Sequence, residues 1–101
     1  MKYYSVLDVT PTNEDWIEDY LPTANKLVKK HGGKYLTRTQ EHEQLEGDTR
    51  EAGLRIVIEW ESKEGAEAFM KDPEYAPHFR DRTQGSVSHH YLIAGKDDLA
   101  S

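Results

Sequence analysis

Four polar side chains lie within, or at the ends of, stretches that are otherwise apolar, and they are the best candidates for chemistry. They are Asp8, Arg38, Glu59 and His90, with the neighbouring His89 as the alternative to the last. A small convergent set of this kind can orient a ligand in an apolar pocket between a sheet and its helices. A carboxylate held there can act as a general acid or base, while an arginine or histidine balances the charge of the intermediate.

The competing interpretation of these residues is structural. Glu59 and Arg38 can pair with each other or with Arg55 across strands, or point to solvent at a sheet margin. The aromatic residues present the same choice, because they can line a small-molecule cavity or simply fill the core: Trp16, Tyr20, Trp60, Phe69 and Tyr75. Both interpretations stay open, because alternation along a strand does not reveal which face is inward.

Five histidines in 101 residues invite a metal-site hypothesis, but their spacing argues against it: His31, His42, His78, His89 and His90. Adjacent residues on a strand point to opposite faces, so His89 and His90 cannot both chelate one ion from an ideal strand. There is no HExxH motif, and His42 stands in a polar stretch. We therefore expect no metal site and no bound cofactor.

Several classes of enzyme lack their sequence signals. The chain has no cysteine, which excludes thiolate nucleophiles and zinc-thiolate clusters. Ser86 and Ser88 have no nucleophile-elbow context, so a serine hydrolase is not expected. Neither a phosphate-binding glycine loop nor a dinucleotide fingerprint occurs. Acid and base groups are what the sequence leaves for catalysis.

Length and charge set further bounds. The 101 residues predict one domain over residues 1–95, with a flexible tail at 96–101. The net charge of −6 repels phosphate backbones, so nucleic acid is not an expected partner. The apolar start of the chain is interrupted by Asp8, unlike a signal peptide, and no membrane partner is expected. We expect a cytoplasmic protein.

Hydrophobic periodicity and turn residues predict the elements that must position these side chains. A helix capped by Thr12 should end at Gly32-Gly33 and kink or split near Pro22, and a second helix should follow the cap Ser62. The expected strands cover residues 3–9, 33–39, 55–60 and 86–94, with a short extra strand at 43–46 and a helical piece at 73–82.

This order predicts a ferredoxin-like α+β sandwich with βαββαβ topology. Both helices would cover one face of a mainly antiparallel sheet. The opposite face would need a cover of its own, and a second copy of the chain is the expected one.

Several segments together resemble the small bacterial family DUF1330. They are GGKYLTR at 32–38, LEGD at 45–48, RIVIEWES at 55–62, AEAF at 66–69 and DPEY at 72–75. They follow the family's order and spacing over nearly the whole chain. The resemblance implies a dimeric α/β barrel, in which two ferredoxin-like subunits pack sheet against sheet. It implies no particular chemistry.

Two functions from different classes fit these observations. The first is a cofactor-independent enzyme that acts by acid-base chemistry on a small organic metabolite, with Glu59, Arg38, Asp8 and His90 around one pocket. The alternative is a non-catalytic dimer that binds a small ligand or serves as an accessory protein. Convergence of the four side chains on one enclosed cavity would distinguish them.

Overall fold

The structure is a computed structural model that describes residues 1–50 and 52–100. Its elements follow in the order β1 (Tyr3–Pro11), α1 (Ile17–Lys30), β2 (Gly33–Thr39), β3 (Leu54–Trp60), α2 (Lys63–Lys71), α3 (Ala76–Gln84) and β4 (Ser86–Ala94). The predicted strands at 33–39 and 86–94 have these bounds, and the helical piece expected near 73–82 is α3. No helix in the described ranges is long and apolar enough to cross a membrane.

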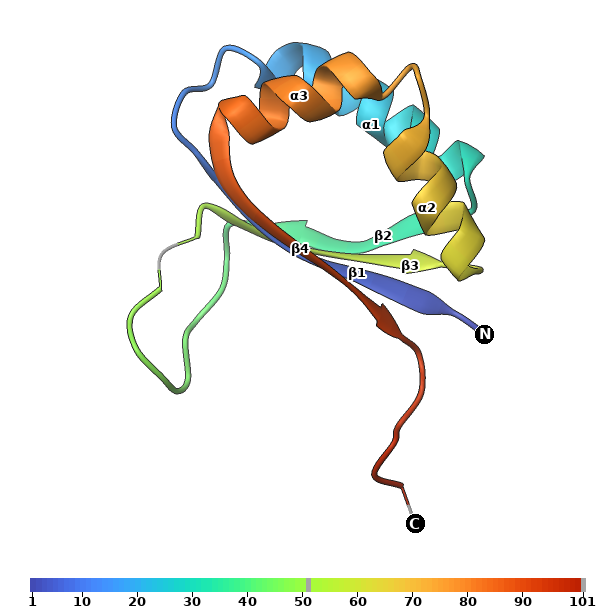
Figure 1. The fold of residues 1–101 in the computed structure, drawn as a ribbon. Coiled ribbons are helices and arrows are strands. Elements are labelled where there is room, and N and C mark those ends of the chain that lie inside the picture. The colour runs from blue at the N-terminus through green and yellow to red at the C-terminus, as the bar shows by residue number, and fades with distance from the viewer. Residues whose placement is uncertain (51, 101) are drawn as a thin grey trace.

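The four strands form one antiparallel sheet in the order β2-β3-β1-β4. The three helices lie together on one face of it, and the described part of the chain puts no helix on the other (Figure 1). This is the expected ferredoxin-like α+β architecture. We call the helix-covered face the inner face and the opposite one the outer face.

Strand alternation assigns each strand residue to one of these faces. Inner-face side chains of the two central strands are buried, among them Ser5, Leu7, Val9, Ile56, Ile58 and Trp60. Four outer-face side chains on β1 and β4 are apolar but exposed: Val6, Val87, Tyr91 and Ile93. The core therefore lies between the inner face and the helices.

Helix α1 begins later than the sequence predicts. Thr12 does not cap it: the Thr12 amide donates to the Gly85 carbonyl at 2.9 Å, and the Trp16 indole N–H donates to the same carbonyl at 3.0 Å. A Cβ on Gly85 would lie 2.4 Å from the Trp16 ring, so only glycine permits this contact. The segment before α1 is thus held against the α3–β4 junction, and helical winding starts at Ile17.

The predicted break at Pro22 is also absent, since α1 is continuous through it. Pro22 is exposed, so the Glu18 carbonyl that loses its amide partner lies on the solvent side, where water can replace it. The helix ends at Lys30 with His31 as its C-cap, and Gly32 with φ +81° follows, as expected of a terminating glycine. Ser62 caps α2 by accepting from the Gly65 amide at 3.1 Å, also as expected.

The short strand predicted at 43–46 does not form. Residues 40–53 connect β2 to β3 as a loop without a helix or strand among its described residues. The Gln44 amide nitrogen donates to the carbonyls of Glu46, Gly47 and Asp48, and Leu45 is 85% exposed. A side chain therefore satisfies the backbone groups that a strand partner would otherwise take.

A β-bulge interrupts the alternation of β2. Tyr35 pairs with Ile58 and Thr37 pairs with Val57, which leaves Leu36 as the extra residue. The sequence predicts Tyr35 and Arg38 on opposite faces. With the bulge between them they share the inner face, where the Arg38 guanidinium lies 3.8 Å from the centre of the Tyr35 ring.

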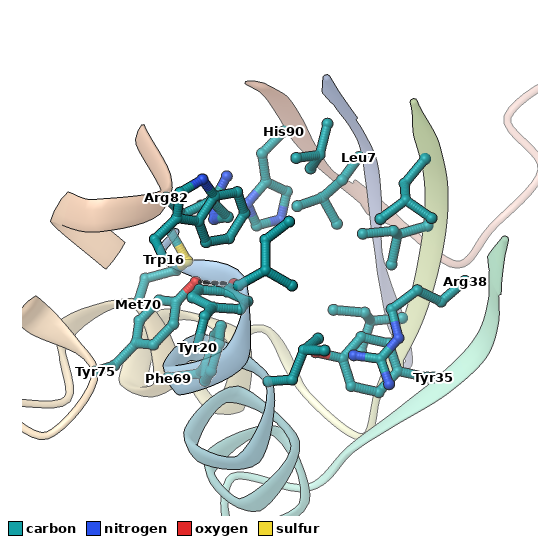
Figure 2. Close-up of a pocket in the computed structure, with 16 residues that line it drawn as sticks. Leu7, Trp16, Tyr20, Tyr35, Arg38, Phe69, Met70, Tyr75, Arg82 and His90 are labelled. Carbon is teal, nitrogen blue, oxygen red and sulfur yellow. Dashed lines mark hydrogen bonds between the residues drawn. The ribbon is translucent and has the colours of Figure 1, made fainter. Parts of the chain in front are cut away.

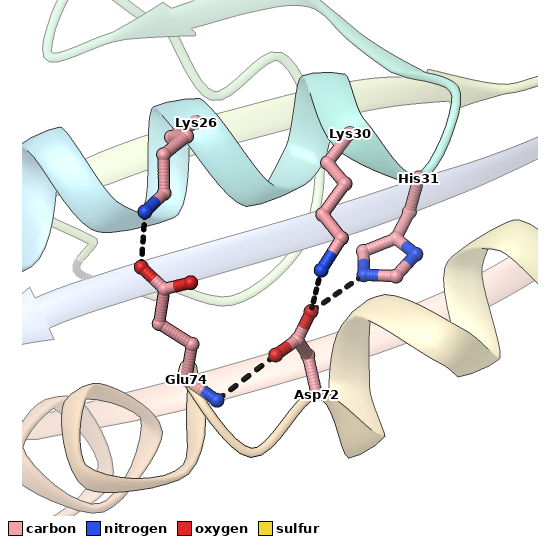
Figure 3. Close-up of polar contacts among 5 residues, drawn as sticks. All are labelled: Lys26, Lys30, His31, Asp72 and Glu74. Carbon is pink, nitrogen blue, oxygen red and sulfur yellow. Dashed lines mark hydrogen bonds and ion pairs between the residues drawn. The ribbon is translucent and has the colours of Figure 1, made fainter.

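A polar cluster joins the C-terminal end of α1 to the turn between α2 and α3 (Figure 3). Asp72 is buried, and its carboxylate accepts from His31 Nε2 at 2.8 Å, Lys30 Nζ at 3.3 Å and the Glu74 amide at 2.9 Å. Lys26 and Glu74 form a further ion pair beside it. These contacts, which we call the Asp72 cluster, hold the helix layer together at this end.

Candidate functional site

A pocket lies between the inner face of the sheet and the three helices (Figure 2). The space that the centre of a water molecule can occupy in it is about 60 Å³. Most of its wall is aliphatic or aromatic, and its charged or titratable lining residues are Tyr20, Tyr35, Arg38, Tyr75, Arg82 and His90. An apolar cleft with a few polar groups is the usual form of a small-molecule site.

The aromatic residues divide between the two roles that the sequence leaves open. Trp16, Tyr20, Phe69 and Tyr75 line the pocket, whereas Trp60 is fully buried in the core and does not. The hydroxyls of Tyr20 and Tyr75 lie 2.7 Å apart and share a hydrogen bond. Burial raises the pKa of Tyr20 well above its ordinary value, so its hydroxyl stays neutral.

Arg82 is the most unusual residue of the pocket. It is 4% exposed and no salt bridge involves it among the described residues. Its Nε is a buried donor with no hydrogen-bond partner in the described part of the chain. Burial alone would lower the Arg82 pKa, but the nearby Tyr75 and Tyr20 oxygens raise it above its ordinary value. The side chain is therefore a buried cation with no counter-ion among residues 1–50 and 52–100.

His90 lies on the inner face of β4, on the wall of the same pocket (Figure 2). Its Nε2 is 2.8 Å from Ser5 Oγ, which in turn accepts from the Trp60 indole N–H at 2.8 Å. Burial and the nearby Arg82 cation lower the pKa of His90, so the imidazole is neutral at pH 7. A fixed neutral imidazole in an apolar pocket can accept a proton.

Arg38 lines the pocket at its β2 side, as Figure 2 shows. Its guanidinium stacks on the Tyr35 ring and donates from Nη1 to Asn25 Oδ1 at 2.8 Å. Unlike Arg82, it has partners within the protein. The bulge at Leu36 is what brings it to this face.

Glu59 and Asp8 do not reach this pocket, so the predicted convergence of four side chains is wrong for these two. Glu59 lies on the outer face, where Lys2 Nζ approaches it to 3.3 Å and the Tyr4 hydroxyl to 3.4 Å. Asp8 pairs there with His89 at 2.9 Å. Strand parity is the reason, because the neighbours of Glu59, Ile58 and Trp60, are both buried on the inner face.

The two adjacent histidines point to opposite faces, as strand geometry predicts: His90 into the pocket and His89 to the outer face. Across residues 1–50 and 52–100, no group of three or more histidine or carboxylate side chains is placed to hold a metal ion.

Arg82 and Ser5 were not predicted as functional candidates, and Tyr20 and Tyr75 were predicted only as aromatic lining and not for their hydroxyls. A signal for Arg82 exists in the spacing of Tyr75, Phe79 and Arg82, which are four and three residues apart and so share one helix face. A cation in phase with two aromatic residues points toward the core. Ser5 offers no such signal, because its partners Trp60 and His90 come from strands far away in the chain.

The site thus has three parts, each from a different element. A neutral base stands on β4, a buried cation on α3, and a hydroxyl pair joins α1 to the segment before α3. No carboxylate lines the pocket among the described residues. The arrangement can take a proton and can stabilise negative charge beside it.

Solved structures with the same fold have very different sequences. RPA0582 from Rhodopseudomonas palustris, a protein of unknown function, is 16% identical with a TM-score of 0.79, and the match covers 95% of this chain and 83% of that one. SnoaB from Streptomyces nogalater, a cofactor-independent oxygenase, is 16% identical with a TM-score of 0.64, covering 99% and 98%. A conserved protein from Methanosarcina mazei is 12% identical with a TM-score of 0.58, covering 95% of each chain.

At these identities the structures support the fold alone. Among curated proteins, none matches the sequence. The sequence does match the family described as Domain of unknown function (DUF1330) over residues 2–96, nearly its whole length. The resemblance in the segments around Arg38, Trp60 and Tyr75 is thereby confirmed, and the chain belongs to the DUF1330 family.

Proposed function

We propose that this protein is a cofactor-independent enzyme that removes a proton from a small organic metabolite in the pocket between the sheet and the helices. The observation that supports this most directly is His90, a neutral imidazole on the pocket wall held by a buried serine. Of the four residues predicted from the sequence, the proposal makes His90 the base. Arg38 lines the same pocket, and Glu59 and Asp8 have no part in the chemistry.

The hydrogen bonds around His90 are compatible with a role as the base. The Trp60 indole is only a donor, so Ser5 Oγ accepts from it and keeps a second lone pair. When His90 Nε2–H donates to that lone pair, Nδ1 is the ring nitrogen free to take the substrate proton. The nearby Arg82 cation would then stabilise the substrate anion, because fixed positive charge acts strongly in a site of low polarity.

One of the similar structures is an oxygenase that needs no cofactor. It supports the view that this fold can carry chemistry on an organic molecule without a bound metal or flavin. For this protein, the substrate anion can either take the proton back from His90 at another atom or react with dioxygen. The experiment below separates these outcomes.

Phenylpyruvate is a suitable probe, since it combines an acidic C–H group with an aromatic body that matches the pocket wall. We expect the wild-type protein to speed exchange of its methylene protons in deuterium oxide, followed by NMR, with oxygen uptake recorded in parallel. His90→Gln should reduce the exchange rate by about 100-fold or more. Binding without faster exchange would favour the non-catalytic ligand-binding alternative.

His89→Gln is the matched control, because the same substitution one residue earlier lies on the outer face. Its exchange rate should stay within about twofold of wild type, which is a small free-energy difference. Equal losses in both variants would contradict a role for His90 as the base.

We also propose that a second copy of the chain covers the outer face. Val6, Val87, Tyr91 and Ile93 leave there a row of apolar side chains, each between 39% and 67% exposed. A face of this kind is a typical association surface in a small domain. Light scattering should report about twice 11.7 kDa, and Tyr91→Asp should shift the protein to monomer. A wild-type monomer would contradict the proposal; we expect the dimer in the cytoplasm.

A further inference from the structure

We infer that the ligand of this pocket is a small organic acid with a planar apolar body, and that its carboxylate is the missing counter-ion of Arg82. The inference rests on the proposed function, which concerns the same pocket. It goes further by naming the two groups that meet, the carboxylate of the ligand and the guanidinium of Arg82.

The first step concerns the unfavourable free energy of burying the Arg82 charge. An ionised group held out of water without a partner is strongly unfavourable, and natural proteins pair or neutralise such groups. Arginine cannot lose its proton under ordinary conditions, so it has no neutral form to adopt. Arg82 is 4% exposed, yet its Nε donor is unpartnered in the described part of the chain. The pocket therefore has a place for an anion, and none of the residues that the structure describes supplies one.

The second step concerns what surrounds the cation. The Tyr20 and Tyr75 hydroxyls share one hydrogen bond at 2.7 Å, which uses only one of their two hydrogens. The other hydrogen is free to donate. An anion beside Arg82 would thus meet the Nε–H group and a phenol O–H group. Carboxylates suit such a site, because guanidinium N–H groups donate to carboxylate oxygens with matching planar geometry.

The third step concerns the rest of the ligand. Beyond the polar groups the wall is built from Trp16, Ile17, Phe69, Met70 and several strand aliphatic residues. A flat apolar body is compatible with these rings and branched chains. A sugar or a polyphosphate would lose its hydration there without new hydrogen bonds. A ligand with one carboxylate on an aromatic or unsaturated body fits both the polar groups near Arg82 and the apolar wall.

The test uses benzoate and its neutral counterpart benzamide, which have nearly the same shape. Titration of the full chain can be followed by Trp16 fluorescence or by NMR. Benzoate should bind with a dissociation constant of about 1 mM, and benzamide at least about tenfold more weakly. This comparison needs no variant. Equal binding of the two compounds, or binding of neither, would overturn the inference.

Variants then locate the contact. Arg82→Met should weaken benzoate binding by at least about tenfold, the usual size of a lost charged hydrogen bond. Arg80→Met, on the exposed side of the same helix, removes the same charge and should leave binding within about twofold. If Arg82→Met does not fold, Arg82→Lys replaces it, and it should also weaken binding because it lacks the planar fork. Unchanged binding in a folded Arg82 variant would overturn the inference.

His90→Gln separates this inference from the proposed function. Benzoate lacks the acidic C–H group that His90 would act on, so the variant should bind it as wild type does while losing proton exchange on phenylpyruvate. Benzoate binding that depends on Arg82 without any exchange would support the inference and contradict the enzyme. Exchange without a preference for benzoate over benzamide would support the enzyme and contradict the inference.

Discussion

Asp72 and Arg82 are both charged and both nearly inaccessible to solvent, at 7% and 4% exposure, but their surroundings differ. Asp72 accepts hydrogen bonds from a histidine, a lysine and a backbone amide, so both of its carboxylate oxygens have partners (Figure 3). Arg82 lies near the neutral hydroxyls of Tyr75 and Tyr20. Its own Nε has no hydrogen-bond partner among the described residues; Figure 2 labels all three side chains. One group is completed by the protein, and the other is completed only by something that the protein binds.

This difference separates structural from functional burial of charge. A carboxylate that gathers partners from α1 and from the turn before α3 links those elements and stabilises the fold. A buried cation with no counter-ion among the described residues lowers stability, and a bound anion would offset that cost. The contrast therefore says where in this small domain binding should be sought.

The comparison assumes a well-packed sheet beneath the helices, and Ile58→Ala tests this with the largest expected effect. Ile58 is 4% exposed in β3, so truncation removes buried methyl groups and leaves a cavity. The free energy of unfolding in urea should fall by about 2 to 5 kcal/mol. Leu45→Ala, at a loop residue 85% exposed, should change it by less than about 0.5 kcal/mol. A similarly small change at Ile58 would mean that burial in this core is not tight.

Arg82→Met tests the unpartnered side of the comparison. Without ligand, replacing the buried cation by an apolar side chain of similar length should raise the free energy of unfolding by about 1 to 4 kcal/mol. Chemical denaturation of the ligand-free protein measures it, with Arg80→Met as the exposed control. If a folded Arg82→Met variant is less stable than wild type, the guanidinium makes stabilising contacts within the ligand-free protein. The contrast with Asp72 would then disappear.

Tyr20→Phe tests how much of the site is held by the protein itself. The variant removes the hydroxyl that bonds to Tyr75 and should cost about 0.5 to 1.5 kcal/mol, the net worth of one hydrogen bond. Urea unfolding measures this loss. An unchanged free energy of unfolding in Tyr20→Phe would argue that the hydroxyl pair is not formed.

Asp72→Asn tests the partnered side through its dependence on pH and should have the smallest effect. The His31, Glu74 and Lys30 contacts lower the Asp72 pKa from 3.8 to about 2. The folded state therefore favours the ionised form, and this stability is present above the unfolded pKa and is lost as pH falls through the folded one. Wild type should be the more stable protein above about pH 4, with the difference vanishing toward pH 2. A difference independent of pH would mean that the carboxylate charge is not what the cluster uses.

Much of the fold follows from local signals along the chain. The run from Arg55 to Trp60 is mostly apolar and forms a central strand. Ser62 and Gly32 mark helix ends through capping chemistry that neighbouring residues decide. Local signals failed where distant groups compete. The segment after Thr12 is held by Gly85, which lies some seventy positions further along the chain, and this contact delays α1.

The candidate site was predictable only in part, and the reason is geometric. His90 and Arg38 were named from their residue types and do line the pocket. Glu59 and Asp8 were named on the same grounds, but the parity of their strands turns them to the outer face. Arg38 reaches the inner face because of one extra residue at Leu36, and composition carries no warning of a bulge.

Residue order alone was enough to establish the α+β class, the family, most element bounds and the presence of a buried central strand, because each depends on neighbours within a few positions or on the whole pattern at once. The tertiary structure alone decided which face of the sheet each polar residue occupies, and which of them meet. Ser5, Trp60 and His90 come from three strands, and Tyr20 and Arg82 from two helices. Contacts across such distances depend on register and packing, which no short stretch of sequence encodes.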